Sequence, residues 1–492
     1  MTEVAEGGPQ QGTQDPRRWI IFVVILLAQL MIVLDTTVVN VALPSAQTAL
    51  GFATDERQWI ITAYTLAFGS MLLVGGKLGD IFGRKRTLVV GVCGFAIASA
   101  LGGAAPSFAF FVGARAVQGA FAGLIAPAVL SLLSTTFTDP ADRNRAFGIY
   151  GAVLISGSSI GLLLGGALTE YVDWRAVMYI NVVFAVVPVT GALKLLRNEV
   201  ADPKPRLDVP GALTVSSGLF ALVFAFSWAE TNSWREPVTV ALLVAGAFLL
   251  ALFVGIESRV AQPLLPLRVL RDRNRGASYI SILIASAALF GVLIFLGFFL
   301  QQNEGYSPVV TGLAFLPLTL AVVVTSPTAQ TKLRPRFGPR PLVVIGMLFG
   351  AAGMLYLTRI DLQSSYATDI LPALVALGVG FGLVFSSATN SGTLGVRPGD
   401  ASVASATVNA SQQVGGSLGT ALLSTLSASA VSSYLTGLRP TPAALAAASV
   451  HGYAAAFAWA ALILAVGAVI AGALYRRQVP ERHRVAAPAV AN

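Results

Sequence analysis

The sequence predicts an all-α polytopic membrane protein with fourteen transmembrane helices. Charged residues make up 11% of the 492 residues and hydrophobic residues 55%, whereas a soluble domain is about 25% charged. The apolar residues also gather in runs long enough to cross about 30 Å of hydrocarbon, and the basic residues cluster in alternate loops. This composition excludes a disordered chain, a coiled coil and an ordinary soluble enzyme.

Fourteen apolar runs are long enough to serve as membrane spans, which need about 20 residues each. The fifth and the thirteenth are the most polar because they are rich in Ser and Gly. The expected spans cover residues 19–41, 58–76, 87–105, 108–134, 145–168, 176–196, 210–228, 238–256, 277–300, 309–330, 342–358, 370–390, 403–426 and 453–475.

The basic residues predict the orientation of these spans. If the N-terminus lies inside, the inner segments hold 26 of the 32 Lys and Arg residues, the outer loops hold 5, and Arg115 lies within a span. Inner loops of membrane proteins carry such an excess of positive charge. We therefore expect both termini in the cytoplasm and no nucleic-acid partner for the net charge of +9. The 27 Arg against 5 Lys, together with Ala-rich segments, are typical of a GC-rich bacterial gene, so we expect a bacterial cytoplasmic membrane as the location.

An internal repeat divides the chain into halves. Lys77, Leu78, Phe82 and Gly83 recur 255 residues later as Lys332, Leu333, Phe337 and Gly338. Pairs of glycines recur in the same order, 119 and 123 at 378 and 382, then 157 and 161 at 415 and 419. Parallel six-helix halves are a transporter architecture with the site at their interface near the midplane.

The repeat predicts the domain organisation. Two six-helix bundles are expected at residues 17–198 and 276–478. Residues 199–275 would form an inserted helix pair, spans 7 and 8, with cytoplasmic linkers. Residues 1–16 and 479–492 are expected to be cytoplasmic tails, the first of them disordered.

Several segments resemble a known family. Residues 76–86 (GKLGDIFGRKR) and the 6+2+6 layout resemble the major facilitator superfamily. Residues 34–44 (LDTTVVNVALP), 115–123 (RAVQGAFAG) and 174–181 (WRAVMYIN) are similar to its fourteen-span drug:proton antiporter branch. The resemblance covers about residues 18–478 and implies a proton-coupled exporter of lipophilic drugs, antibiotics or natural products that works by alternating access.

Two positions depart from the family pattern. Leu162 stands where the antiporter motif of span 5 usually has a proline, and Pro335 stands where the first copy of the loop motif has Asp80. An uptake symporter or a facilitator of another small solute on the same fold therefore stays open as the alternative function.

Enzyme chemistry finds no support in the sequence. There is no GxxxxGK[ST] loop for ATP hydrolysis. The histidines, His451 and His483, lie outside the spans, and Cys93 is the single cysteine. We expect a secondary transporter without metal or cofactor, driven by a proton gradient.

Asp35 and Arg115 are the candidate proton-coupling residues. An acid at the bilayer centre costs about 2.5–3.5 kcal/mol on insertion scales, and a rise of 1.5 Å per residue places both side chains at a similar depth. They could form a static ion pair or a proton site. The resemblance implies that Asp35 couples protons and that Arg115 supports it.

The inner loop after span 2 is the candidate conformational switch. Asp80 is expected to cap the next helix while the basic residues reach lipid headgroups. A plain positive-inside hairpin is the alternative to a charge latch between two access states, which is the role that the resemblance implies. The residues concerned are Gly76, Gly79, Asp80, Gly83, Arg84 and Lys85.

Glycines in span 5 predict close helix packing, because small residues every four positions line one helix face. The residues are Gly157, Gly161, Gly165 and the adjacent Gly166. They could serve packing alone or form a sliding contact between the halves.

Polar and aromatic residues within apolar spans are candidates for lining a substrate cavity. The amide and hydroxyl groups could equally form hydrogen bonds between helices. Since Asp35 is the one acid well inside a span, the cavity should favour neutral, zwitterionic or monocationic lipophilic molecules. We expect the protein to function as a monomer in the lipid bilayer. The candidates are Asn40, Tyr64, Gln118, Asn181, Phe298, Asn409 and Gln413.

Overall fold

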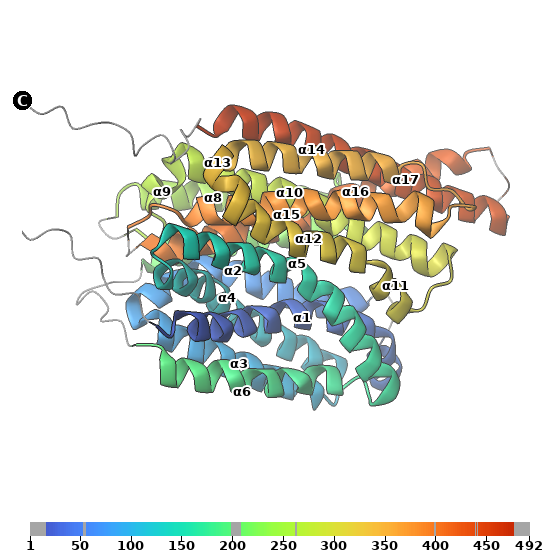
Figure 1. Cartoon of the computed structure of the whole chain (residues 1–492). Coiled ribbons are helices and arrows are strands. Elements are labelled where there is room, and N and C mark those ends of the chain that lie inside the picture. Colours follow the sequence, from blue (N-terminus) through green and yellow to red (C-terminus); the bar gives the residue numbers. More distant parts are fainter. Residues whose placement is uncertain are drawn as a thin grey trace, which may run out of the picture.

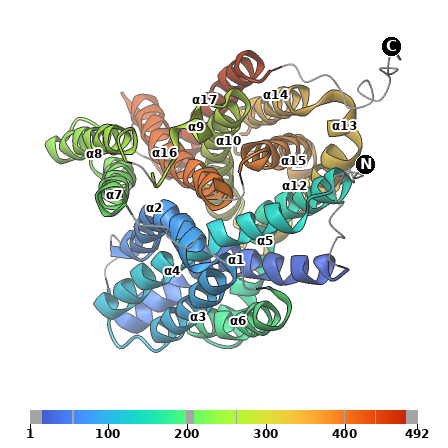
Figure 2. The same cartoon turned by 90° about the vertical axis from the view of Figure 1, so that its left-hand side faces the viewer.

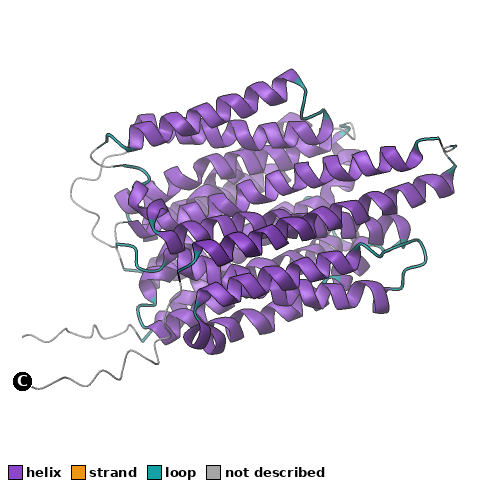
Figure 3. Cartoon of the chain, turned by 90° about the horizontal axis from the view of Figure 1, so that it is seen from above, coloured by secondary structure: helices purple, strands orange, loops and turns teal. Residues whose placement is uncertain are grey.

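The computed structural model describes residues 16–52, 56–197, 208–260, 263–397, 400–437, 439 and 441–476, and within these ranges it contains helices and no strands (Figure 3). Thirteen helices in this part of the chain are long and apolar enough to cross a membrane. The helix α5, at Pro140–Tyr171, is not among these thirteen, but with 32 residues it is also long enough to span. The prediction of an all-α membrane fold with about fourteen spans is confirmed.

The first six long helices follow the predicted spans and extend beyond several of them. Pro140 begins α5, where a proline costs no backbone hydrogen bond, and the Asp139 side chain caps its first turn. The helices are α1 (Arg18–Leu50), α2 (Arg57–Phe82), α3 (Arg84–Gly103), α4 (Phe108–Thr136), α5 (Pro140–Tyr171) and α6 (Ala176–Leu195).

Several of the later spans are built from more than one piece. Short π-helical turns continue or precede longer helices, as η2 does after α10. The elements are α7 (Val209–Thr231), α8 (Pro237–Glu257), α9 (Leu267–Arg271), α10 (Arg273–Phe298), η2 (Phe299–Asn303), α11 (Pro308–Ala314), α12 (Leu316–Thr328), η3 (Ala329–Leu333), α13 (Arg334–Phe337), α14 (Pro339–Leu357), η4 (Tyr366–Ile370), α15 (Leu371–Thr393), α16 (Ala401–Leu435) and α17 (Pro442–Leu474).

The helices form two groups that pack side by side. The helices α1 to α6 form one group and α10 to α17 the other (Figures 1 and 2). The two groups meet where α5 packs on α11, α12 and α15, and where α2 and α4 pack on α16. The pair α7 and α8 lies at the side of the molecule, where α7 contacts both α2 and α16 (Figure 2).

The repeat seen in the sequence corresponds to repeated geometry. Gly83 and Gly338 both adopt positive φ angles, of 89° and 75°, at a sharp break between consecutive helices. Glycine is the residue that tolerates this conformation without strain. Gly119 and Gly378 also match. A Cβ atom at Gly119 would collide with the backbone of α2 at Tyr64, and one at Gly378 would collide with the backbone of α12 at Leu318.

Both chain ends of the helical bundle lie at the same end of the molecule. Arg273 at the start of α10 donates 2.7 Å to the carbonyl of Leu474 at the end of α17. At the starts of α1 and α5, Arg18 donates 2.9 Å to Asp142, and the next residue, Arg143, bonds to the end of α15. We call this the basic end; it is the end that the charge distribution predicts to be cytoplasmic.

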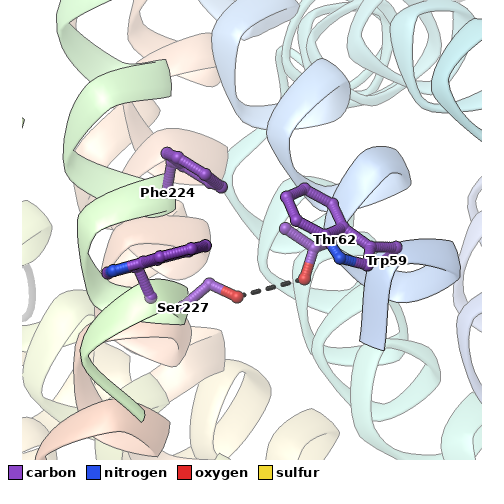
Figure 4. Close-up of a pocket in the computed structure, with 5 residues that line it drawn as sticks. Trp59, Thr62, Phe224 and Ser227 are labelled. Atoms are coloured by element: carbon purple, nitrogen blue, oxygen red, sulfur yellow. Dashed lines mark hydrogen bonds between the residues drawn. The ribbon is translucent and has the colours of Figure 1, made fainter. Parts of the chain in front are cut away.

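The inserted pair is bonded to both groups. Near the opposite end, the hydroxyls of Thr62 in α2 and Ser227 in α7 lie 3.1 Å apart, beside a recess lined by the aromatic rings of Trp59, Phe224 and Trp228 (Figure 4). The indole of Trp234 donates 2.6 Å to Thr425 of α16. The pair therefore bridges the two halves along one side.

Candidate functional site

Asp35 lies in the middle of α1 and is 1% exposed. Its Oδ2 atom accepts a hydrogen bond of 2.6 Å from Nη1 of Arg115, which comes from α4 and is 2% exposed. A buried carboxylate needs such a charge-assisted partner, because an unpaired ion in a low-dielectric interior is very costly. The sequence-based estimate that the two side chains share one depth is therefore correct.

Two amides complete the polar shell of Asp35. Gln118, one turn after Arg115 in α4, donates 2.7 Å to Oδ1 of Asp35 and accepts 2.6 Å from Arg115. Asn181 of α6 donates 2.7 Å to the same Oδ1 atom and 3.0 Å to the hydroxyl of Ser99 in α3. The carboxylate thus accepts hydrogen bonds from two other helices.

Tyr64 of α2 covers the cluster from the side. Its ring centroid lies 4.3 Å from Cζ of Arg115, which is a cation–π contact. The Tyr64 hydroxyl and Nε of Arg115 are buried and have no hydrogen-bond partner among the described residues. Since α1, α2, α3, α4 and α6 supply the cluster, the ion pair lies within the first half rather than at the interface between halves.

The predicted cavity residues have different surroundings. Tyr64, Gln118 and Asn181 belong to the Asp35 cluster and bond between helices. Asn409 turns back on its own helix and donates 2.9 Å to the carbonyl of Ser405. Gln413 is half-buried and lies against Gly69 of α2, between the halves.

Two further candidates are exposed. Asn40 is exposed, five residues beyond Asp35 in α1. Phe298 at the end of α10 is 45% exposed. The structure therefore does not bring these two residues together with the Asp35 cluster.

The segment expected to be an inner loop is helical over most of its length. The helix α2 continues to Phe82, so Asp80 lies inside it and does not cap α3, contrary to the prediction. Gly83 occupies the N-cap position of α3, and within the described residues no side chain caps that helix. The single residue Gly83 suffices for the turn because its positive φ reverses the chain abruptly.

The basic residues after Gly83 are also placed differently from the prediction. Arg84 is buried rather than directed to headgroups. Lys85 donates 2.8 Å and 2.7 Å to the carbonyls of Leu193 and Leu196, which end α6. A lysine at this position satisfies carbonyls that the helix leaves unpaired.

The same segment of α2 touches the second half. A Cβ atom at Gly76 would lie 3.0 Å from the carbonyl of Ser402, at the start of α16. Ser402 also hydrogen-bonds to Asp80, and its hydroxyl lies 3.0 Å from that of Ser131 in α4. Gly76 therefore permits a close approach between the halves at the basic end, and Gly79 lies against the same Ser402.

A polar network missed by the sequence analysis joins the halves at the same end. Arg143 of α5 donates 3.1 Å to Asn390 and 3.0 Å to Thr393, both in α15. The Asn390 amide in turn donates 2.9 Å to Asn144 and 2.8 Å to Gln330. The available signal was the presence of two amides, Gln330 and Asn390, in apolar runs; Arg143 was counted only as a charge of an inner loop.

The glycines of α5 contact α1, not the second half. A Cβ atom at Gly157 would lie 2.8 Å from Val33, and one at Gly165 would lie 2.9 Å from Val38. One at Gly161 would collide with the Thr37 hydroxyl. The idea that these three form a sliding contact between the halves is wrong, because they pack within the first half.

Other glycines of α5 do face the second half. A Cβ atom at Gly148 would lie 2.6 Å from Pro327, one at Gly151 would lie 3.1 Å from Ser386, and one at Gly166 would lie 2.7 Å from Val309. The helix α5 thus has two close-packed faces, one on α1 and one on the second half.

Comparison with known proteins identifies the family. A family model described as Major Facilitator Superfamily matches residues 25–420. The chain belongs to this superfamily. A superfamily member of this kind is a membrane transporter, not an enzyme.

Curated members of the superfamily resemble the chain over most of its length. "Puromycin resistance protein pur8" of Streptomyces alboniger is 48% identical over 94% of this chain and 92% of its own. "Cephamycin export protein CmcT" of Amycolatopsis lactamdurans is 36% identical over 82% and 84%. The "Tetracenomycin C resistance and export protein" of Streptomyces glaucescens is 35% identical over 84% and 77%.

A solved structure shares the superfamily fold. The crystal structure of the human organic anion transporter MFSD10 (TETRAN) aligns with a TM-score of 0.62 over 93% of this chain and 100% of its own. Its sequence identity of 16% supports the fold alone.

Proposed function

We propose that the protein is a proton-coupled antiporter that exports lipophilic, antibiotic-type molecules from a bacterial cell. The names of relatives that are 31–48% identical to this chain describe resistance to, or export of, antibiotics. These names favour export over the uptake alternative. The proposal assigns the energy source to the proton gradient and the coupling to Asp35.

The buried Asp35–Arg115 pair carries this proposal. Protonation of Asp35 removes the charge that holds Nη1 of Arg115 at 2.6 Å. The guanidinium would then be buried without a counter-ion, which is costly enough to drive a rearrangement. The amides of Gln118 and Asn181 bond to the same carboxylate, so a change at Asp35 reaches α4 and α6 together.

The contacts at the basic end supply the second requirement, a barrier that opens and closes. The Arg143–Asn390 bond and the close approach of Gly148 to Pro327 join the halves there. Access from the cytoplasm requires these contacts to separate. The motif residues Gly76, Gly79 and Asp80 lie at the same barrier, against Ser402, which supports their assignment to the conformational switch.

The test is transport by the full chain in proteoliposomes with an imposed pH gradient, with puromycin as the probe. We expect uphill movement of the probe opposite to a measurable proton flux. The Asp35→Asn variant should lose this gradient-driven movement. Asp142→Asn is the matched control, because Asp142 pairs with Arg18 at the partly exposed basic end. Probe movement in the same direction as protons would show a symporter, and equal movement without a gradient would show a facilitator.

A further inference from the structure

A second buried acidic pair lies where the inserted helices meet the basic end. Asp208 precedes α7 and is 8% exposed, and Glu257 ends α8 and is 4% exposed. Oδ1 of Asp208 accepts 3.0 Å from the amide of Gly211 and so caps α7. The two oxygens of Glu257 accept 3.1 Å and 3.0 Å from the amides of Leu264 and Leu265.

The two carboxylates converge on one point. A Cβ atom at Gly211 would collide with Oδ2 of Asp208 and would lie 2.8 Å from Oε1 of Glu257. Oδ2 of Asp208 is buried and has no hydrogen-bond partner within the described ranges. An unsatisfied anionic oxygen beside a second carboxylate is doubly unfavourable, because it combines desolvation with like-charge repulsion.

Among the described residues, the surrounding charges leave this pair with one excess negative charge. Lys77 of α2 donates 3.3 Å to the carbonyl of Pro263 and interacts with both Glu257 and Asp80. Asp80 also interacts with a second cation, Arg84. Asp400, which also faces Asp80, pairs with Arg268 at 2.8 Å.

Counted over the described residues, the cluster holds one carboxylate more than it holds cations. The carboxylates are Asp80, Asp208, Glu257 and Asp400, and the cations are Lys77, Arg84 and Arg268. An uncompensated charge in a buried position is removed most cheaply by binding a proton. The two acids that converge beside Gly211 are the natural place for that proton.

We propose that Asp208 and Glu257 together bind one proton, forming a second proton site that holds the start of α7 against the end of α8, beside the switch segment of α2. The two acids share this proton, because Oδ2 of Asp208 has no hydrogen-bond partner among the described residues and lies beside Oε1 of Glu257. The one negative charge that the pair keeps lies opposite Lys77. Loss of the proton to the cytoplasm restores the repulsion between the two carboxylates and loosens the start of α7 from the end of α8. The site is separate from Asp35, and it does not depend on what the protein transports.

The experiment is infrared difference spectroscopy on the purified full chain in lipid nanodiscs as the pH is raised. A protonated carboxyl group has its own carbonyl absorption, which disappears on deprotonation. All variants carry Asp35→Asn and Arg115→Gln, so that the buried pair of the coupling site contributes no signal. We expect one carboxylic-acid band in this background. It should be lost in both Asp208→Asn and Glu257→Gln, since either change leaves a single carboxylate beside Lys77.

Three controls make the result decisive. Lys77→Met should enlarge the band, because the pair then needs a second proton, an effect that a merely structural role would not produce. Asp142→Asn, in a partly exposed ion pair, should leave the band unchanged. Lys204→Gln with Arg206→Gln removes two cations of the chain that lie outside the described residues, and it should also leave the band unchanged.

The proposal fails under three outcomes. The first is a band that survives both Asp208→Asn and Glu257→Gln. The second is a band that is lost instead in Asp80→Asn. The third is a band that is absent from the background protein and emerges only when Lys204 and Arg206 are neutralised, which would show that these cations already compensate the pair.

Discussion

The interaction of Asp35 with Arg115 predicts that Asp35→Asn alone will destabilise the protein more than Asp35→Asn combined with Arg115→Gln. In Asp35→Asn the amide oxygen still accepts from Gln118 and Asn181, but Arg115 keeps its charge at 2% exposure without a counter-ion. Breaking a buried pair in this way costs about 3–5 kcal/mol. We expect the lower figure, because the surrounding amides remain bonded. The change is a large fraction of the 5–15 kcal/mol that typically stabilises a domain.

Adding Arg115→Gln removes the stranded charge. Replacing both members of a buried ion pair by neutral groups is often close to neutral for stability. The double variant should therefore regain most of the lost stability, while it still lacks the titratable group and so does not couple protons to export. Stability and function separate in this pair of variants.

The assay combines thermal unfolding in detergent with gradient-driven transport in proteoliposomes. The expected order of stability is wild type, then the double variant close to it, then Asp35→Asn clearly below. Transport should be lost in both variants. Additive destabilisation by the two substitutions would refute the structural reasoning, and gradient-driven transport by the double variant would refute the role of Asp35.

Four further predictions follow from the same structure. Arg115→Lys should reduce transport strongly, because lysine lacks the planar fork that reaches the carboxylate and the amide together; initial rates in proteoliposomes measure it. Gly161→Ala should destabilise the protein, by about 1–3 kcal/mol for overpacking, whereas Gly113→Ala, with open space around its Cβ position, should not, as thermal unfolding will show. Cysteines introduced in the 232–236 loop between α7 and α8 should react with an impermeant reagent from outside the cell, and Cys93 should not react from either side. Divalent cationic dyes should be poor substrates in an efflux panel, and strong resistance to them without resistance to neutral compounds of similar size would contradict this.

The general fold could be predicted because its determinants are local. Run length and the distribution of Lys and Arg depend only on the bilayer and its potential. The inner loop was mispredicted for the opposite reason. Gly76 and Gly79 resemble turn residues in the sequence, yet in the fold both lie within the helix α2. They face Ser402, and the missing Cβ of Gly76 lets α2 pass close to it. Only the packing of the second half distinguishes these two uses of glycine.

The depth of the candidate site in the membrane was predictable from the sequence, but the direction in which its side chains point was not. Counting residues along α1 and α4 places Asp35 and Arg115 at one level, since the rise per residue is constant. The rotation of each helix about its axis is set by its neighbours, and therefore Tyr64, Gln118 and Asn181 could not be told from cavity residues in advance. Arg143 was missed because its bonds to Asn390 and Thr393 cross between halves, about 250 residues apart in sequence.

The two close-packed faces of α5 suggest how the buried acid and the distant barrier are connected. The glycines at 157, 161 and 165 contact Val33, Thr37 and Val38, the residues of α1 on either side of Asp35. Contacts this close, in which α5 contributes no side chain, leave little room for α1 to move independently of α5. The same α5 carries Arg143, which bonds to Asn390 of the second half. We therefore infer that a displacement of α1 upon protonation of Asp35 moves α5 as well and strains the bonds that close the basic end, so that the packing of one helix links proton binding to access.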